Sequence, residues 1–126
     1  MPATTSPNRF TSFRVDPATL VLEPWPLERG QVVAGDPRVA GVVLDVSADG
    51  RVERGVWEHS PGASRDVEAD ELFVVVSGRA TVEVEAGPDL ELGPGDVGVF
   101  RSGQRTTWRV RETLRKVFQV TKPGGE

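Results

Sequence analysis

One acid and the only histidine of the chain are its clearest candidates for acid–base chemistry. Glu71 opens the most apolar stretch of the sequence, residues 71–77, and His59 ends an earlier stretch, residues 55–59. A carboxylate and an imidazole that face each other across a pocket can act as proton acceptor and proton donor. The sequence therefore gives Glu71 and His59 as candidate catalytic residues.

Both residues also have structural interpretations. A buried carboxylate needs a partner, so Glu71 can equally form an ion pair with Lys116 or with an arginine. His59 lies near a predicted strand end, where it can be a rim residue. Asp96 follows Pro94 and Gly95, and its side chain is expected to bond to the backbone of its own turn.

Short stretches with strand periodicity must position these side chains. Residues 79–85 alternate apolar and polar side chains, which is the pattern of a strand with one buried face. Residues 71–77 are apolar almost throughout, which predicts a strand that is covered on both faces. The other predicted strands are residues 39–46, 55–59, 90–92, 97–100, 106–110 and 115–120. Turns rich in glycine separate them, so the fold class is all-β, a sandwich or barrel.

The chain has 126 residues, which suits one domain. Residues 1–12 are expected to be a disordered lead, and residues 121–126 a tail. Residues 13–38 hold four of the ten prolines and predict an extended arm with an edge strand at 19–23. Residues 39–120 are the predicted barrel. At most a single helical turn is expected at 16–19 and at 111–114.

Composition excludes several classes of protein. The chain has no cysteine, which rules out disulfides and thiolate metal sites and fits a cytoplasmic protein. No apolar run reaches 18 residues, so no membrane span is expected, and residues 1–10 lack the apolar core of a signal peptide. The net charge of −4 argues against nucleic acid as a partner.

The order of its motifs makes the chain resemble a known family. The motifs are Gly55-x-Trp57-Glu58-x-Ser60-Pro61-Gly62, Glu71-x6-Gly78, Pro94-Gly95-Asp96-x6-Gly103, Thr107-Trp108 and Arg115-Lys116. This set is similar to the cupin superfamily, and within it to the subfamily with ureidoglycine aminohydrolase-like and EutQ-like domains. The likeness covers about residues 22–120 and implies a single-domain jelly-roll barrel, the double-stranded β-helix.

The resemblance implies a metal site whose histidines this chain lacks. Of the four usual cupin ligands only Glu71 is present. The histidine positions hold Arg65 and Val67, or Ser64 and Asp66, and then Thr106. A transition metal needs several converging ligands, so we expect no metal cofactor and no metal-dependent aminohydrolase reaction.

Alternation along the predicted strands suggests what the barrel holds instead. If Glu71 points inward, so does Phe73, and the same rule groups Trp57 with His59 and Thr106 with Trp108. We expect a partly polar pocket, although the tryptophans can equally be core residues. The candidate ligand-binding residues are Trp57, Arg65, Phe73, Thr106, Trp108 and Lys116.

Three function classes follow. The favoured one is a metal-independent barrel that binds a small polar or anionic metabolite. The second is an enzyme of ureidoglycine aminohydrolase-like, sugar-modifying or amide-modifying type that uses Glu71 and His59. The third is a structural or regulatory dimer with a filled barrel. A homodimer is expected in any case, because the proline-rich arm and the edge strands need covering.

Overall fold

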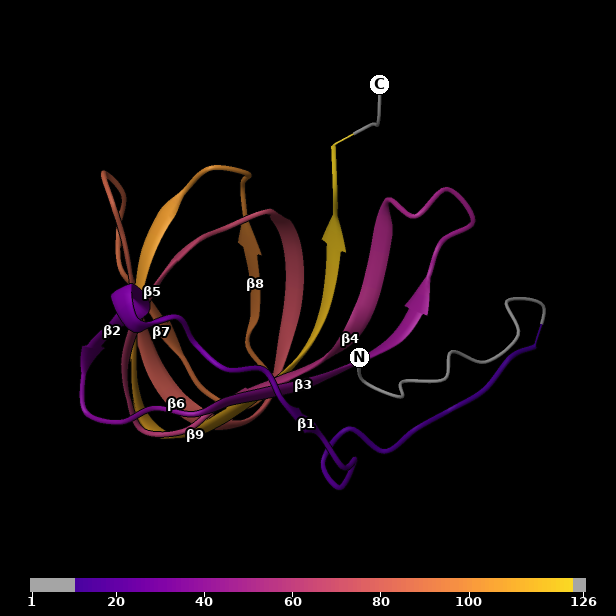
Figure 1. Ribbon diagram of the computed structural model, residues 1–126, viewed down its shortest axis with the longest axis horizontal. Coiled ribbons are helices and arrows are strands. Elements are labelled where there is room, and N and C mark those ends of the chain that lie inside the picture. The colour runs from indigo at the N-terminus through magenta and orange to yellow at the C-terminus, as the bar shows by residue number, and fades with distance from the viewer. Residues whose placement is uncertain (1–10, 124–126) are drawn as a thin grey trace.

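Nine strands and one 3₁₀ turn make up the computed structural model, which describes residues 11–123 (Figure 1). The elements follow in the order β1 (Glu23–Pro24), η1 (Arg29–Gln31), β2 (Val32–Ala34), β3 (Val39–Val46), β4 (Val52–His59), β5 (Gly62–Val67), β6 (Asp70–Val84), β7 (Leu90–Leu92), β8 (Val97–Phe100) and β9 (Arg105–Thr121). Within residues 11–123, no helix is long and apolar enough to cross a membrane.

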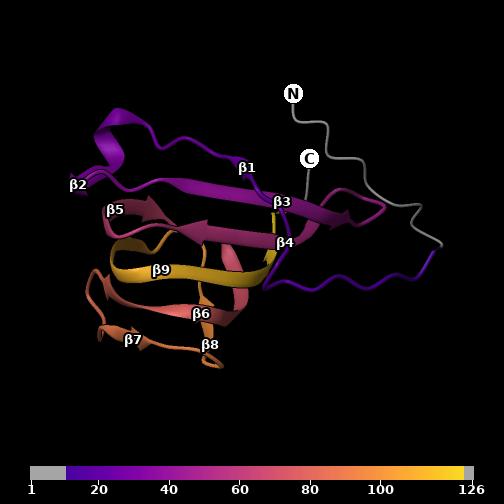
Figure 2. The same cartoon turned by 90° about the horizontal axis from the view of Figure 1, so that it is seen from below.

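The long strands β6 and β9 join two layers into a barrel. They pair antiparallel along almost their whole length, from Asp70 opposite Thr121 to Val84 opposite Thr106. One layer has the order β8-β6-β9-β4-β3-β1, and the other has β7-β6-β9-β5-β2. This curled, antiparallel all-β architecture is the predicted jelly-roll barrel, and Figure 2 shows β1 and β3 on the side opposite β7 and β8.

A break in the β6–β9 register marks the bend between the layers. The pairing shifts between Val75 and Ala80, and Gly78 in this interval has a φ of 94°. A Cβ atom at Gly78 would collide with the backbone of Thr113, so only glycine fits the bend. The glycine of the Glu71-x6-Gly78 motif is therefore needed where β6 passes from one layer to the other.

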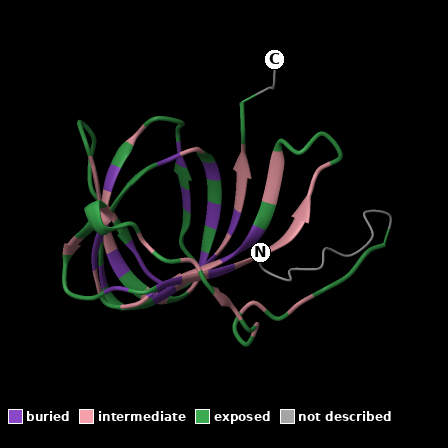
Figure 3. Cartoon of the chain, in the orientation of Figure 1, coloured by how far each residue is buried: buried purple, intermediate pink, exposed green. Residues whose placement is uncertain are grey.

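The core lies between the layers and follows the two-residue period of the strands. On β6, Glu71, Phe73 and Val75 are buried, whereas Leu72 and Val74 are exposed. Figure 3 shows such alternation as buried and exposed bands along the strands. Within a single chain, the prediction that residues 71–77 are covered on both faces is therefore wrong. An apolar run does not distinguish a doubly buried strand from one with an apolar outer face.

Most predicted strands are confirmed, and two predictions near them are wrong. The bounds of β3, β7 and β8 are those expected. Residues 111–114 form the middle of β9 and not a helical turn, because pairing with β4 and β6 overrides the local preference. The predicted edge strand at 19–23 is reduced to Glu23–Pro24. The turn at 16–19 forms, with Asp16 as its acceptor.

The sequence did not predict β5 at all. Its residues, Gly-Ala-Ser-Arg-Asp-Val, lack an apolar alternation because small and polar side chains fill its inward positions. Pairing with β9 on one edge and β2 on the other makes it a strand. This omission matters because β5 carries part of the site.

The proline-rich arm packs across the barrel of its own chain. Arg115 donates hydrogen bonds of 2.9 Å to the backbone oxygens of Pro17 and Leu20. Further along, the ring of Trp25 lies 6.5 Å from that of Phe118. Residues 1–10 of the predicted lead and 124–126 of the predicted tail lie outside the described residues.

Candidate functional site

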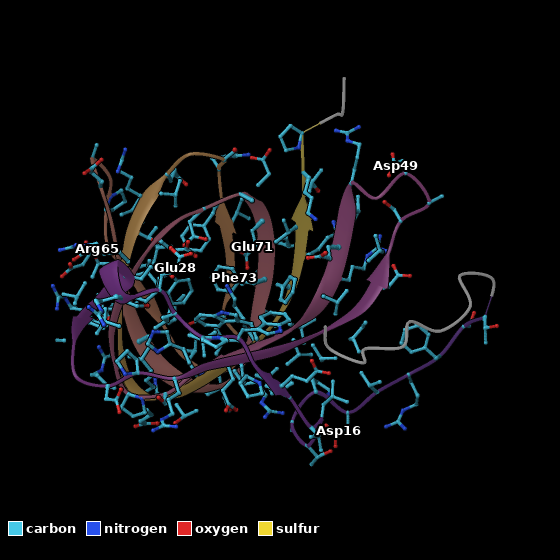
Figure 4. All side chains as sticks on the ribbon, viewed as in Figure 1. Asp16, Glu28, Asp49, Arg65, Glu71 and Phe73 are labelled. Carbon is cyan, nitrogen blue, oxygen red and sulfur yellow. The ribbon has the colours of Figure 1, made fainter. Side chains whose placement is uncertain are left out.

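A small cavity of about 120 Å³ lies inside the barrel among aromatic rings and acids. It is smaller than the roughly 300–1,000 Å³ of pockets for drug-sized ligands, and its size suits a small molecule. Figure 4 shows Glu71 between the two layers of the barrel. The residues that line the cavity are Trp25, Trp57, Asp66, Glu68, Glu71, Trp108, Lys116, Phe118 and Val120.

The ammonium group of Lys116 lies in an aromatic cage. Its Nζ atom is 4.4 Å from the ring centre of Trp57, 4.6 Å from that of Trp108 and 4.8 Å from that of Phe73. Ring faces attract a cation electrostatically, and more strongly where water is excluded. Only 4% of Lys116 is exposed, so the cage holds a desolvated charge.

Glu71 supplies the counter-charge of this ammonium. Its Oε2 atom is 2.7 Å from Lys116 Nζ, and both side chains are buried. The distance is that of an ion pair, but the direction is poor, and Oε2 has no aligned hydrogen-bond donor among the described residues. Burial raises the pKa of Glu71, while the charge of Lys116 acts in the opposite direction. Glu71 Oε2 can therefore accept a hydrogen bond from a donor group of a ligand.

Two further acids, which the sequence did not single out, also face the cavity. Glu68 is buried, and its Oε2 atom accepts hydrogen bonds from Thr106 Oγ1 at 2.7 Å and Trp108 Nε1 at 3.0 Å. Asp66 lies two residues earlier. Asp66 lies on β5, and Glu68 comes just after that strand ends at Val67; both line the cavity. Predicting β5 would have revealed Asp66 and, by continuing the same two-residue period, Glu68.

Asp66 lies at the mouth of the cavity. Partial burial and, after it, the charge of Glu68 raise its pKa to about 6. The residue as a whole is nevertheless exposed, so solvent screens this interaction and limits its effect on stability. Asp66 also lines a second, outer hollow of about 730 Å³, and therefore stands at the boundary between the two spaces.

His59 does not face Glu71 across the cavity. The imidazole is fully buried, with Nδ1 2.6 Å from the backbone oxygen of Ser60 and Nε2 2.8 Å from Ser64 Oγ. A backbone oxygen only accepts, so Nδ1 carries the proton and Nε2 accepts from the Ser64 hydroxyl. Burial lowers the pKa of His59. The imidazole is thus neutral and hydrogen-bonded through both ring nitrogens. Its ring centre lies 5.5 Å from that of Trp57.

The structure brings most of the other predicted residues together. Trp57, Trp108 and Lys116 line the cavity, and Phe73 completes the cage under Lys116. Thr106 is buried and does not line the cavity; its hydroxyl donates a hydrogen bond to Glu68, which does. Arg65 does not belong to this group, because it is exposed on the outer face of β5 and lines only the outer hollow.

Three further side chains close the cavity, and the sequence signals two of them. Alternation along residues 115–120 groups Phe118 and Val120 with Lys116, and the structure places all three on the inward face of β9. The sequence missed Trp25, because this residue comes from the arm and no local pattern predicts that the arm crosses the barrel.

The donor set does not fit the metal that a cupin barrel usually holds. Thr106, at one expected histidine position, is hydrogen-bonded to Glu68. Ser64, which is one of the two candidates for another such position beside Arg65, is hydrogen-bonded to His59. Lys116 already places a positive charge 2.7 Å from Glu71, the one remaining ligand. Among residues 11–123, no three His, Cys, Asp or Glu side chains are arranged to hold a metal ion.

Comparisons with solved structures agree with the fold. A protein of unknown function from Pseudomonas syringae pv. tomato superposes with a TM-score of 0.72 at 23% identity, over 82% of this chain and 45% of the other. A putative ethanolamine utilization protein Q from Salmonella typhimurium gives 0.60 at 19% identity, over 69% and 72%. Ectoine synthase from P. lautus gives 0.61 at 16%, over 78% and 69%. At these identities the likeness concerns the fold alone.

The comparison with protein families shows to which family the chain belongs. No curated protein matches it. The EutQ-like cupin domain matches residues 46–118, which is more than half of the 126 residues and includes the cage, Glu71 and Glu68. The chain therefore belongs to the EutQ-like cupin domain family.

Proposed function

We propose that this protein is a metal-independent barrel that binds a small polar molecule in the cavity beside Glu71. The observation that carries the proposal is the Glu71 Oε2 atom, which lies buried in the wall of a cavity without an aligned donor. Leaving a buried carboxylate oxygen incompletely bonded costs free energy, and a ligand that donates to it recovers part of that cost.

The cavity walls suit a small ligand that is partly apolar. Trp25, Trp57 and Trp108 provide flat apolar surfaces, and acids provide a few convergent polar groups, which is the usual composition of ligand sites. An anionic metabolite, which the sequence alone left open, is disfavoured. Lys116 is occupied by Glu71 and the aromatic cage, and Asp66 and Glu68 would repel an anion.

Native mass spectrometry of the purified protein, combined with elemental analysis, tests the proposal. We expect a small molecule to co-purify or to bind on addition, and to be lost in the Glu71→Gln variant, whose amide places a donor where the carboxylate accepts. Stoichiometric manganese, iron, nickel or zinc that survives chelation would contradict a metal-independent site. The Asp36→Asn variant, at an exposed acid outside both hollows, is the control.

An enzyme is the second candidate, and one observation favours it. Burial raises the pKa of Glu71 inside a cavity, a combination that is enriched among catalytic acids and bases. The proton partner in this case is Lys116, at 2.7 Å, because both ring nitrogens of His59 are occupied elsewhere. Turnover of a small amide, ureide or sugar derivative that Glu71→Gln abolishes without loss of binding would establish catalysis.

A further inference from the structure

We propose that the ligand is a small organic cation, an ammonium compound whose charge lies beside Asp66 and Glu68. This inference rests on the proposed function, since it names the chemical class that the same cavity takes. Three features support it, namely the charge balance of the cavity, the aromatic walls and the position of Asp66.

The cavity has an excess of negative charge. Three carboxylates line it, those of Asp66, Glu68 and Glu71, against one ammonium, that of Lys116, which leaves a net charge of −2 when all four are ionised. Lys116 is paired with Glu71. Among residues 11–123, no ion pair involves Asp66 or Glu68, and the donors to Glu68 Oε2 are the neutral groups of Thr106 and Trp108. A bound cation would supply the missing counter-charge.

The aromatic walls already stabilise one ammonium group. Three ring centres lie within 4.8 Å of Lys116 Nζ, so this lining and an ammonium are compatible at close range. The indole of Trp25 lines the same cavity, but no described cation lies over it. A second ammonium group can therefore bind on the aromatic surface that Lys116 leaves free. Its positive charge would be compensated by Asp66 and Glu68, whereas that of Lys116 is compensated by Glu71.

Asp66 gives such a cation a path from solvent. Its side chain lines both the outer hollow and the inner cavity, and Glu68 follows it on the inward face. A cation that enters through the outer hollow thus meets one carboxylate at the mouth and a second, buried one behind it. Carboxylates at a mouth with low-dielectric walls also raise the local concentration of cations.

Calorimetric titration with two matched probe pairs tests the inference. Choline is compared with 3,3-dimethylbutan-1-ol, which has its shape without its charge, and propylammonium with propan-1-ol. We expect at least one cation to bind about tenfold more tightly than its neutral counterpart. The preference should shrink severalfold in Asp66→Asn and in Glu68→Gln and persist in Asp36→Asn, an exposed acid outside the cavity.

The outcomes separate this inference from the function on which it rests. Equal binding of a charged probe and its neutral counterpart, or a co-purified ligand that is an anion, would overturn the cationic class and leave the binding function standing. A cationic preference that both Asp66→Asn and Glu68→Gln retain in full would also overturn the assigned position. Absence of any co-purified molecule, together with no heat from all four probes, would contradict the binding function itself.

Discussion

Lys116 Nζ lies 2.7 Å from Glu71 Oε2, and neither side chain has appreciable contact with solvent. These two residues come from the paired strands β9 and β6, and they place an ion pair in the wall of the cavity. The pair contributes two charged groups to the lining of the cavity. It also leaves Asp66 and Glu68 as the acids that remain for a ligand.

Removing the ammonium of this pair should destabilise the fold strongly. Lys116→Met leaves the Glu71 carboxylate buried without its counter-charge, and breaking a buried pair from one side costs about 3–5 kcal/mol. Urea denaturation measures the loss of unfolding free energy. Adding Glu71→Gln to Lys116→Met should recover part of it, because the uncompensated charge is then removed.

The matched control for this experiment is an exposed ion pair. Arg54 lies 2.6 Å from Asp45 near the end of the β3–β4 hairpin, where solvent reaches both side chains. Arg54→Met should cost no more than about 1 kcal/mol. Equal losses in the Arg54 and Lys116 variants would show that burial does not distinguish the two pairs.

The ionisation of Asp66 predicts a pH dependence of stability. Its pKa is about 6 in the folded protein and 3.8 without the fold, so between these values the folded state holds the proton that the unfolded state has lost. The free energy of unfolding should therefore fall as the pH rises from about 4 to 6. Asp66→Asn removes this contribution, so its stability relative to the wild type should increase over that interval and stay constant above it. A pH-independent difference in denaturation midpoint would refute the assignment.

His59 is predicted to stabilise the fold and not to act on a ligand. Replacing it with Phe leaves the backbone oxygen of Ser60 and the Ser64 hydroxyl without their buried partner, which costs about 1–3 kcal/mol for such groups. Affinity for the ligand of the cavity should change less than twofold. If His59→Phe instead abolishes a reaction while denaturation shows an intact fold, the acid–base role inferred from the sequence is correct.

We expect the chain to form a homodimer through the outer face of β6 and β8. Leu72 lies opposite Val99 and Val74 opposite Val97 on this face, and all four side chains are exposed, whereas the arm contacts β3 and β9 instead. Light scattering at micromolar concentration should give the mass of a dimer. Val99→Glu should give a monomer. The control is Val67→Glu, which should leave the dimer intact, because Val67 is similarly exposed (58% against 52% for Val99) but lies on β5. A monomeric wild-type protein would contradict the prediction.

Local sequence patterns predicted the strands and half of the site. Period-two alternation and glycine turns are properties of adjacent residues, so β3, β7, β8 and the bend at Gly78 could be predicted from the chain alone. The same period placed Glu71 with Phe73, and Trp57, Trp108 and Lys116 on inward faces. The sequence could also name Lys116 as one possible partner of Glu71, although an arginine was an equal alternative.

Only the tertiary structure decided the rest of the site. β5 has no pattern of its own and becomes a strand through its pairing with β9, which turns Asp66, and Glu68 just after the strand, toward the cavity. The arm carries Trp25 to the same place, and Ser64 turns His59 away from Glu71. Residues of this kind are far apart in the sequence, and their contacts depend on how the barrel closes. The sequence by itself determined a cupin barrel without metal-binding histidines, and closure of that barrel determined which charges share its interior.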